Sequence, residues 1–357
     1  MSTFLADAVN HGGHGEHGER QGNSGRPVVF SALTPNPASL GLFKTFPVFP
    51  VPPVVKQAFH ESADYPMRPL LLFLLLTLAF SIHADVIVRD DAGQTVRLNA
   101  PAQRIVSLAP HITELLYAAG AGSRLVGAVE YSDYPEAAKK LPRLGGYERI
   151  DLEALLALKP DLVIGWQSGT PTTQVDKIRA LGLPVFLSQP NKIDDVAVDL
   201  ERYGQLAGTT PIAAPAAAAF RQRLAALRAR YSARPTVRVF YEVWNQPLMT
   251  VGGPQIISDA LRLCGGENVF AQLSSMAPSV GVEAVLAANP EAIVAAGMGD
   301  ARPEWLDDWK KWPRLTAAQR GNLFHIHPDL MHRHTPRLLD GSEQLCRHLE
   351  TARSRRR

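Results

Sequence analysis

The sequence contains one helix-and-strand unit twice. Residues 151–164, DLEALLALKPDLVI, return as GVEAVLAANPEAIV at residues 281–294. In each copy a short helical stretch ends at a proline, which cannot continue a helix, and a short apolar run typical of a buried strand follows. Such a unit is half of an α/β crossover, so its duplication predicts two similar α/β lobes. Two lobes that face each other commonly bind a ligand in the cleft between them.

An apolar run from Leu70 to Phe80 follows a basic start at Met67 and precedes small residues that end at Ala84. This pattern is typical of a secretory signal, so we expect residues 67–84 to be a signal peptide and the mature chain to begin at Asp85. The run is too short to span a bilayer as a helix.

Residues 1–66 precede that signal, are rich in Gly, His and Pro, and show no helical or strand period. We interpret them as a translated leader that is absent from the working protein, because a secretory signal acts from the N-terminus. A His-rich metal-binding arm is the alternative.

Charge and cysteine content narrow the class of protein. A net charge of +3 is too weak a bias to indicate nucleic-acid binding, and we interpret residues 353–357 as a solvated basic tail. An even number of cysteines in a secreted chain predicts a disulfide between Cys264 and Cys346. No cysteine stands at the signal exit to carry a lipid anchor. We therefore expect a soluble protein of the periplasm.

The mature chain divides into two lobes and a connecting helix. Residues 85–210 open with a hairpin signature and then alternate strands with helices, which predicts a parallel-rich sheet covered by helices. Residues 211–232 have the strongest intrinsic helix preference in the chain and would form a stiff rod between the lobes. Residues 233–352 repeat the alternation. The predicted fold class is α/β, with two Rossmann-like lobes joined by one long rigid helix and a ligand cleft between them.

Catalytic signatures are mostly missing from the sequence, which contains no phosphate-binding glycine loop, nucleophile elbow or paired-cysteine metal motif. The exception is His325 and His327, whose spacing would place both on one face of a strand and could support a zinc or haem site. A metal-dependent hydrolase is therefore one alternative, and solvated histidines at a strand end are the other. We predict no catalytic residue and no bound metal.

Aromatic residues are more informative, because six of them stand at or just after predicted strand ends, where open α/β sheets meet their ligands. They are Tyr131, Tyr134, Tyr147, Trp166, Tyr241 and Trp244. Several flat side chains around one cleft favour a large planar ligand. Glu153 and Glu283 occupy the same position in the two repeats, where each would stabilise a helix N-terminus or dock on a partner with matching symmetry.

Several motifs resemble the family of periplasmic cobalamin-binding proteins that feed an ABC importer. They are RIVSLAP at 104–110, TEL at 113–115, YSDYP at 131–135, KPDLV at 159–163 and CGGENVF at 264–270. The resemblance extends over nearly all of residues 104–350, although siderophore and haem receptors share this helix-linked architecture. It implies a monomer that captures cobalamin or a related corrinoid as transported ligand and delivers it to a dimeric ABC permease in the inner membrane, without a cofactor and without chemistry.

The resemblance also implies roles for individual residues. It pairs Cys264 with Cys346 and makes Glu153 and Glu283 the permease-docking acids. The implied ligand-binding residues are His111, Tyr131, Tyr147, Trp166, Val243, Trp244, Met249, Asp329 and Arg333, with His111 expected in a loop.

Five positions depart from the family pattern. His111 and Ala277 stand where a small residue and a tryptophan are expected, Tyr147 replaces a tryptophan, and Val243 and Met249 replace phenylalanines. The second lobe therefore offers less aromatic surface, which leaves room for another corrinoid, such as one without a lower base, or for haem. A haem-binding or ferric-siderophore-binding protein is the alternative.

Overall fold

The computed structural model describes residues 85–146, 149–297, 299 and 301–356. The predicted leader, the predicted signal peptide and Tyr147 lie outside the described residues. No helix in the described part of the chain is long and apolar enough to cross a membrane.

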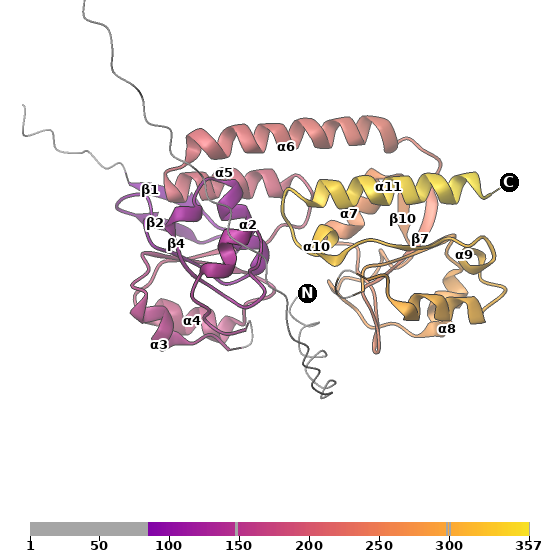
Figure 1. The fold of residues 1–357 in the computed structure, drawn as a ribbon, viewed down its shortest axis with the longest axis horizontal. Coiled ribbons are helices and arrows are strands. Elements are labelled where there is room, and N and C mark those ends of the chain that lie inside the picture. Colours follow the sequence, from indigo (N-terminus) through magenta and orange to yellow (C-terminus); the bar gives the residue numbers. More distant parts are fainter. Residues whose placement is uncertain (1–84, 147–148, 298, 300, 357) are drawn as a thin grey trace, which may run out of the picture. The chain divides into compact units, whose positions relative to one another are not determined.

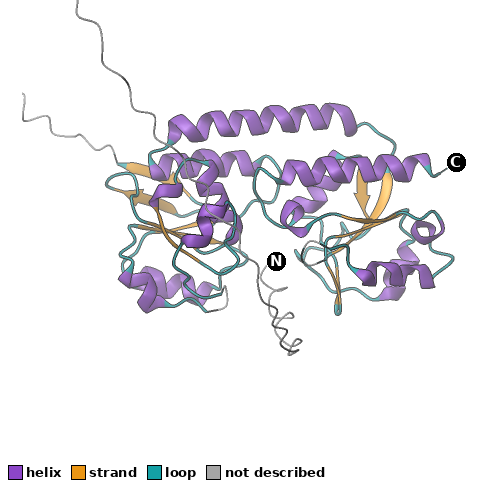
Figure 2. Cartoon of the chain, in the orientation of Figure 1, coloured by secondary structure: helices purple, strands orange, loops and turns teal. Residues whose placement is uncertain are grey.

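The N-terminal lobe begins with an antiparallel hairpin and continues with a parallel sheet (Figures 1 and 2). The hairpin strands are β1 (Val86–Arg89) and β2 (Thr95–Leu98). The sheet has the order β4-β3-β5-β6, with β3 (Ile105–Ser107), β4 (Leu125–Ala128), β5 (Leu162–Trp166) and β6 (Val185–Ser188). Its helices are α2 (Pro110–Ala118), α3 (Leu152–Ala157), α4 (Thr172–Ala180) and α5 (Asp195–Ala207), with 3-10 turns η2 (Gly122–Arg124) and η3 (Glu136–Lys140).

The C-terminal lobe has a parallel sheet of the same order, β10-β7-β11-β12. Its strands are β7 (Val237–Glu242), β10 (Gly266–Asn268), β11 (Ala292–Ala295) and β12 (Leu323–His325), with a small hairpin of β8 (Trp244–Asn245) and β9 (Leu248–Met249). Its helices are α7 (Ile256–Leu263), α8 (Val282–Ala288), η4 (Glu304–Lys311), α9 (Thr316–Gln319), α10 (Pro328–Met331) and α11 (Leu338–Ser354).

The duplicated sequence folds twice into the same unit. In each copy a short helix, α3 or α8, leads into an inner strand of its sheet, β5 or β11. Leu155 and Val285 hold equivalent positions in the two helices, and both are fully buried. Lys159 and Asn289 follow the two helices in the left-handed backbone conformation, with φ of 47° and 41°. Each directly precedes a proline, which prevents the helix from continuing. The predicted fold class, two α/β lobes with parallel sheets, is confirmed.

Helix α6 (Thr210–Tyr231) connects the lobes as a rod of 22 residues. It packs against α5 of the N-terminal lobe and against α7 and α11 of the C-terminal lobe (Figure 1). Its buried side includes Phe220, Leu224, Leu227 and Tyr231, which belong to one apolar cluster shared with both lobes. Because burying a large apolar side chain stabilises a fold by about 1.5 to 3 kcal/mol, this face fixes α6 along both lobes.

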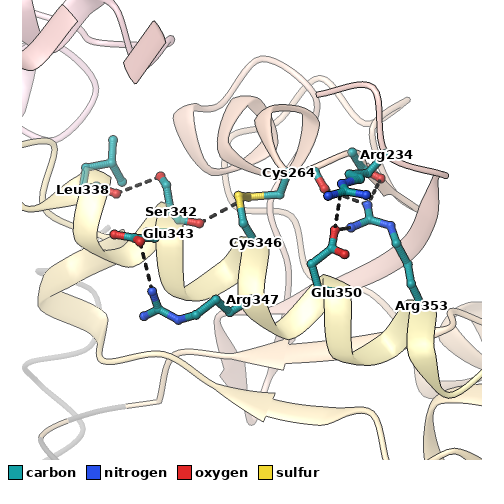
Figure 3. The surroundings of a disulfide bond; sticks show 10 residues. Arg234, Cys264, Leu338, Ser342, Glu343, Cys346, Arg347, Glu350 and Arg353 are labelled. Atoms are coloured by element: carbon teal, nitrogen blue, oxygen red, sulfur yellow. Dashed lines mark hydrogen bonds and ion pairs between the residues drawn. A yellow bond between two sulfur atoms is a disulfide. The ribbon is translucent and has the colours of Figure 1, made fainter. Parts of the chain in front are cut away.

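The predicted disulfide is present between Cys264, at the end of α7, and Cys346 in α11 (Figure 3). It bridges a sequence separation of 82 residues. Closing a loop of that length restricts the unfolded chain and stabilises the fold by about 4 kcal/mol.

The arginine cluster that we predicted to be a solvated tail is instead attached to the C-terminal lobe. Arg353 belongs to α11 and donates to the carbonyls of Pro235 and Cys264 at 2.6 and 2.8 Å. Arg356 pairs with Glu291 at 2.7 Å. The prediction was wrong because carbonyl groups far away in the sequence accept these guanidinium protons.

Candidate functional site

The carboxyl ends of the parallel strands carry the residues that could form a site. In the N-terminal lobe β3 leads into α2 with His111, β4 leads to Tyr131, and β5 ends at Trp166. In the C-terminal lobe β7 is followed by Val243, and β12 by the segment that carries Asp329. Because ligands of open α/β sheets bind at this edge, the topology places these residues at the expected end of each lobe.

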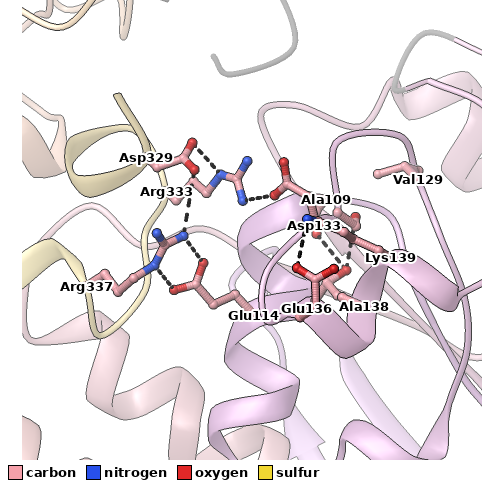
Figure 4. A network of polar contacts seen from close by, with 12 residues as sticks. Ala109, Glu114, Val129, Asp133, Glu136, Ala138, Lys139, Asp329, Arg333 and Arg337 are labelled. Atoms are coloured by element: carbon pink, nitrogen blue, oxygen red, sulfur yellow. Dashed lines mark hydrogen bonds and ion pairs between the residues drawn. The ribbon is translucent and has the colours of Figure 1, made fainter. Parts of the chain in front are cut away.

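A network of ions joins the two lobes at this edge (Figure 4). Arg333 forms two ion pairs, from Nη1 to Asp133 Oδ1 at 2.6 Å and from Nε to Asp329 Oδ1 at 2.9 Å. Arg337 binds both carboxylate oxygens of Glu114 at 2.7 Å. Burial opposes ionisation of Asp133, but the hydrogen bond and charge of Arg333 prevail and lower the pKa of that carboxyl. The network therefore couples α2 and the loop after β4 to the segment between α10 and α11.

Arg337 also covers an aromatic side chain of the other lobe. Its guanidinium lies 3.9 Å from the centre of the Tyr134 ring, which is 45% exposed. This is a cation–π contact, and it keeps one ring face from any ligand.

Three aromatic rings from the two lobes form a second cluster. His111 lies 5.3 Å from Trp166 and 5.1 Å from His334 between ring centroids, and Trp166 lies 5.8 Å from His334. All three side chains are buried. Within the described part of the chain, Nε2 of His111, Nε1 of Trp166 and Nδ1 of His334 have no hydrogen-bond partner. We define these three residues as the ring cluster.

Two residues of the ring cluster lie in a different structural environment from the one that the sequence predicted. His111, expected in a loop, is the second residue of α2, because Pro110 at the first helical position begins the helix there. Trp166, expected to lead into the cleft from the strand end, is 6% exposed and lies within β5, an inner strand of its sheet.

Tyr131, in the loop after β4, is exposed rather than buried. Tyr131 is 51% exposed and has φ of 61°, a conformation that costs a bulky residue energy. The strained backbone directs a large aromatic side chain into solvent, which is typical of a residue held for contact with a ligand. Tyr241, expected at the same edge, is fully buried and contacts His332 Nε2 through its hydroxyl at 3.2 Å.

The other predicted ligand residues of the C-terminal lobe lie around its small hairpin. Trp244 pairs with Met249 across β8 and β9, and both side chains are half-buried. Val243 is buried and donates its backbone N–H to the Met249 carbonyl at 2.9 Å. The indole of Trp244 donates to the Gln246 carbonyl at 2.7 Å. Met249 and Trp244 thus remain partly open for contact, whereas Val243 supports them.

Sequence reasoning missed a polar pocket of about 630 Å³ at the carboxyl ends of β5 and β6. It lies between the loops after β5 and β6, the turn between β1 and β2, α5 and one residue of the other lobe. The lining residues are Gln167, Ser168, Gln189, Asn191, Asp91, Asp195, Val198, Arg202 and Met276. The side-chain amide of Gln189 contacts Met276 Sδ at 3.7 Å. The sequence signal for this pocket was the position of Gln167 and Gln189, whose amide side chains directly follow the buried strands β5 and β6.

The predicted histidine pair does not form one site. His325 ends β12 and contacts the Ala296 carbonyl through Nε2 at 2.9 Å, whereas His327 caps α10 by accepting from the Asp329 N–H. No group of three or more potential metal ligands occurs within the described ranges.

Glu153 and Glu283 both lie in the first turn of a short helix, α3 and α8, and both side chains are exposed. Neither carboxylate pairs with a cation of the described residues. The two acids are therefore open to a partner molecule.

Comparison with known proteins adds four findings. The profile of a family described as periplasmic binding protein matches residues 105–330. A vitamin B12-binding protein of Vibrio campbellii is 36% identical over 258 residues, which cover 72% of this chain and 93% of the relative. The crystal structure of a periplasmic vitamin B12-binding protein of Vibrio cholerae has a TM-score of 0.66 and 37% identity, covering 71% of this chain and 98% of that one. A periplasmic heme-binding protein of Roseiflexus sp. RS-1 has a TM-score of 0.61 and 25% identity over 70% and 99%.

Proposed function

The chain belongs to the periplasmic binding protein family, and we propose that it captures cobalamin or a related corrinoid and delivers it to an ABC importer. This is a family of binding proteins and not of enzymes, which decides against the hydrolase alternative. The family also agrees with the predicted periplasmic location.

One observation carries the choice of ligand. The identity to a vitamin B12-binding protein is 36% and extends over 93% of that relative, so it includes both lobes and not only a shared scaffold. The heme-binding structure of similar fold is 25% identical. Haem and ferric siderophores are the alternative ligands.

The proposed binding mode uses the features at the carboxyl ends of the strands. Tyr131, Trp244 and Met249 offer partly exposed apolar surface for the flat ring system. The polar pocket at the ends of β5 and β6 offers side-chain amides, together with charged groups, that could bind the amide side chains of a corrinoid. Asp329 adds an acceptor and Arg333 a donor from the C-terminal lobe. Binding leaves the covalent structure of the corrin ring unchanged, so transport is the whole function.

Delivery would use the two exposed acids of the repeats. We propose that Glu153 and Glu283 meet basic residues on the two subunits of a dimeric permease, because each holds the same position in a similar lobe. Charge pairs of this kind set orientation and association rate more than affinity. We expect the free protein to be a monomer, which light scattering after size-exclusion chromatography measures.

Co-elution tests the ligand. Purified protein is mixed with excess cyanocobalamin, or separately with haemin, and passed through a desalting column. The proposal expects the corrinoid absorbance to elute with the protein. Retention of haemin alone would assign the protein to haem transport.

A further inference from the structure

The ring cluster holds polar atoms that the protein does not use. Nε2 of His111, Nε1 of Trp166 and Nδ1 of His334 are buried and have no hydrogen-bond partner among the residues that the structure describes. More than about 90% of buried polar groups in proteins are paired, and an unpaired one costs about 1 to 3 kcal/mol. Three such atoms on three rings in mutual contact indicate that a ligand binds at the ring cluster.

We propose that Nε2 of His111 is an axial ligand to the cobalt of a corrinoid that lacks its own lower base, so that the protein supplies the missing imidazole. This proposal rests on the proposed function and names the corrinoid class that the same site selects. The Co–N bond forms as an axial water leaves, and the oxidation state of cobalt does not change.

The geometry favours His111 over His334 as the ligand. Nε2 is at the far end of the imidazole, where a wide macrocycle can approach it without meeting the main chain. The free nitrogen of His334 is Nδ1, which stands next to the ring carbon that joins the side chain to its backbone. A macrocycle above that nitrogen would collide with the chain. His334 therefore acts as a positioning residue through its ring contact at 5.1 Å.

The protonation state of His111 also suits this role. Burial lowers the pKa of its imidazole well below the ordinary value, and the nearby His334 and Arg333 lower it further. Imidazole binds metals in its neutral form. The side chain thus has a free lone pair throughout the neutral pH range.

Access to Nε2 follows from the chain topology. His111 belongs to α2 of the N-terminal lobe, whereas His334 follows α10 of the C-terminal lobe. The two rings cover each other, so separation of the lobes uncovers both. A corrin that enters between them replaces the contact between the histidines and meets Trp166 edge-on.

Electron paramagnetic resonance of bound cob(II)inamide tests the proposal. Cobinamide has no lower base, so its cobalt lines are split by nitrogen only when the protein supplies a nitrogen ligand. We expect each resolved cobalt line to become a triplet in the wild-type complex and a doublet when the protein is labelled with ¹⁵N-histidine. This readout needs no substitution and is independent of whether any variant folds. Unsplit lines for a bound complex would overturn the proposal while leaving corrinoid binding intact.

Two matched variants assign the nitrogen to a residue. His111→Ala should abolish the splitting and weaken cobinamide binding by about tenfold, and added imidazole should restore the splitting. His334→Ala, which removes the other histidine of the same cluster, should keep it. The reverse pattern would overturn the assignment to His111. If calorimetry detects binding of neither cobinamide nor cobalamin, the proposed function fails together with this inference.

Discussion

Arg333 of the C-terminal lobe donates from Nη1 to Asp133 Oδ1 of the N-terminal lobe at 2.6 Å, across a sequence separation of 200 residues. The Arg333 side chain is only 7% exposed, whereas Asp133 is 46% exposed. Four residues away, Arg337 holds the buried carboxylate of Glu114 with two hydrogen bonds. The lobes are thus joined by two ion pairs, of which the Arg333–Asp133 pair has a half-exposed carboxylate and the Arg337–Glu114 pair a buried one.

The two pairs should differ in their contribution to the free energy of unfolding. Asp133→Asn is expected to cost less than about 1 kcal/mol, because solvent screens the half-exposed Asp133 carboxylate and the buried Arg333 keeps its second partner, Asp329. Glu114→Gln is expected to cost about 2 to 3 kcal/mol, because it leaves Arg337 partly buried without its bidentate partner. Urea denaturation of both variants measures the difference. Equal costs would mean that burial does not decide the strength of these pairs.

Tyr131 and Tyr134 form a matched pair for the ligand site, since both rings are exposed but Arg337 covers only Tyr134. We expect Tyr131→Ala to weaken corrinoid binding by about tenfold, which corresponds to the loss of roughly 1.4 kcal/mol of ring contact. Tyr134→Ala should change affinity less than threefold, a difference of about 0.6 kcal/mol. Fluorescence titration measures both. A larger effect at Tyr134 would place the ring system of the ligand on the Arg337 side.

The docking prediction concerns the acids of the two repeats. Changing Glu153 and Glu283 together to Ala should sharply slow corrinoid uptake by cells, because the association with the permease loses its guiding charges. Affinity for the ligand should stay within a factor of about two, since exposed substitutions away from a site perturb a fold by no more than about 0.5 kcal/mol.

Asp176 and Glu267 supply the control for that experiment. They are exposed acids, one in each lobe, and their double change to Ala alters the net charge equally. Uptake by this control should match the wild type. If both double variants lose uptake alike, the effect is one of total charge and the docking role of Glu153 and Glu283 is wrong.

His334 gives the protein an acid-sensitive contribution to stability. Burial lowers its pKa from 6.5 to about 3 in the folded state. Between those values the unfolded chain binds more protons than the folded one, so this contribution is present above pH 6.5 and is lost as the pH falls toward 3. The slope is at most about 1.4 kcal/mol per pH unit.

The variant His334→Gln isolates that contribution. Burial raises the pKa of Asp199 to about 7 and that of Glu242 to about 8, so these groups favour folding at acid pH and oppose His334 in the wild type. They are present in both proteins and cancel in the difference. Denaturation from pH 4 to pH 7 should show that the wild type loses stability on acidification more steeply than the variant. Parallel curves would show that His334 titrates normally in the folded protein.

The sequence predicted the architecture because the architecture depends on local pattern. The repeat with its prolines predicted two lobes, and the alanine-rich stretch predicted a long helix where α6 lies at Thr210–Tyr231. The surroundings of Trp166 could not be predicted in this way. A polar loop follows it, yet β5 has neighbours on both sides and its five residues are all buried.

Contacts between distant segments also escaped the sequence analysis. The prediction listed Asp329 and Arg333 only through a resemblance, and Asp133, the partner of Arg333, lies in the other lobe, so that their approach depends on the whole fold. His111 is a milder case. Pro110 before it is a recognised helix-start signal, and this signal would have placed His111 in α2.

Isothermal titration calorimetry with the purified mature protein tests the central claim most directly. Cyanocobalamin and haemin are titrated separately into the same preparation. Our account predicts one corrinoid bound per chain, with haemin at least about a hundredfold weaker, a difference of about 2.7 kcal/mol. Tight binding of haemin with no heat from cyanocobalamin would contradict it.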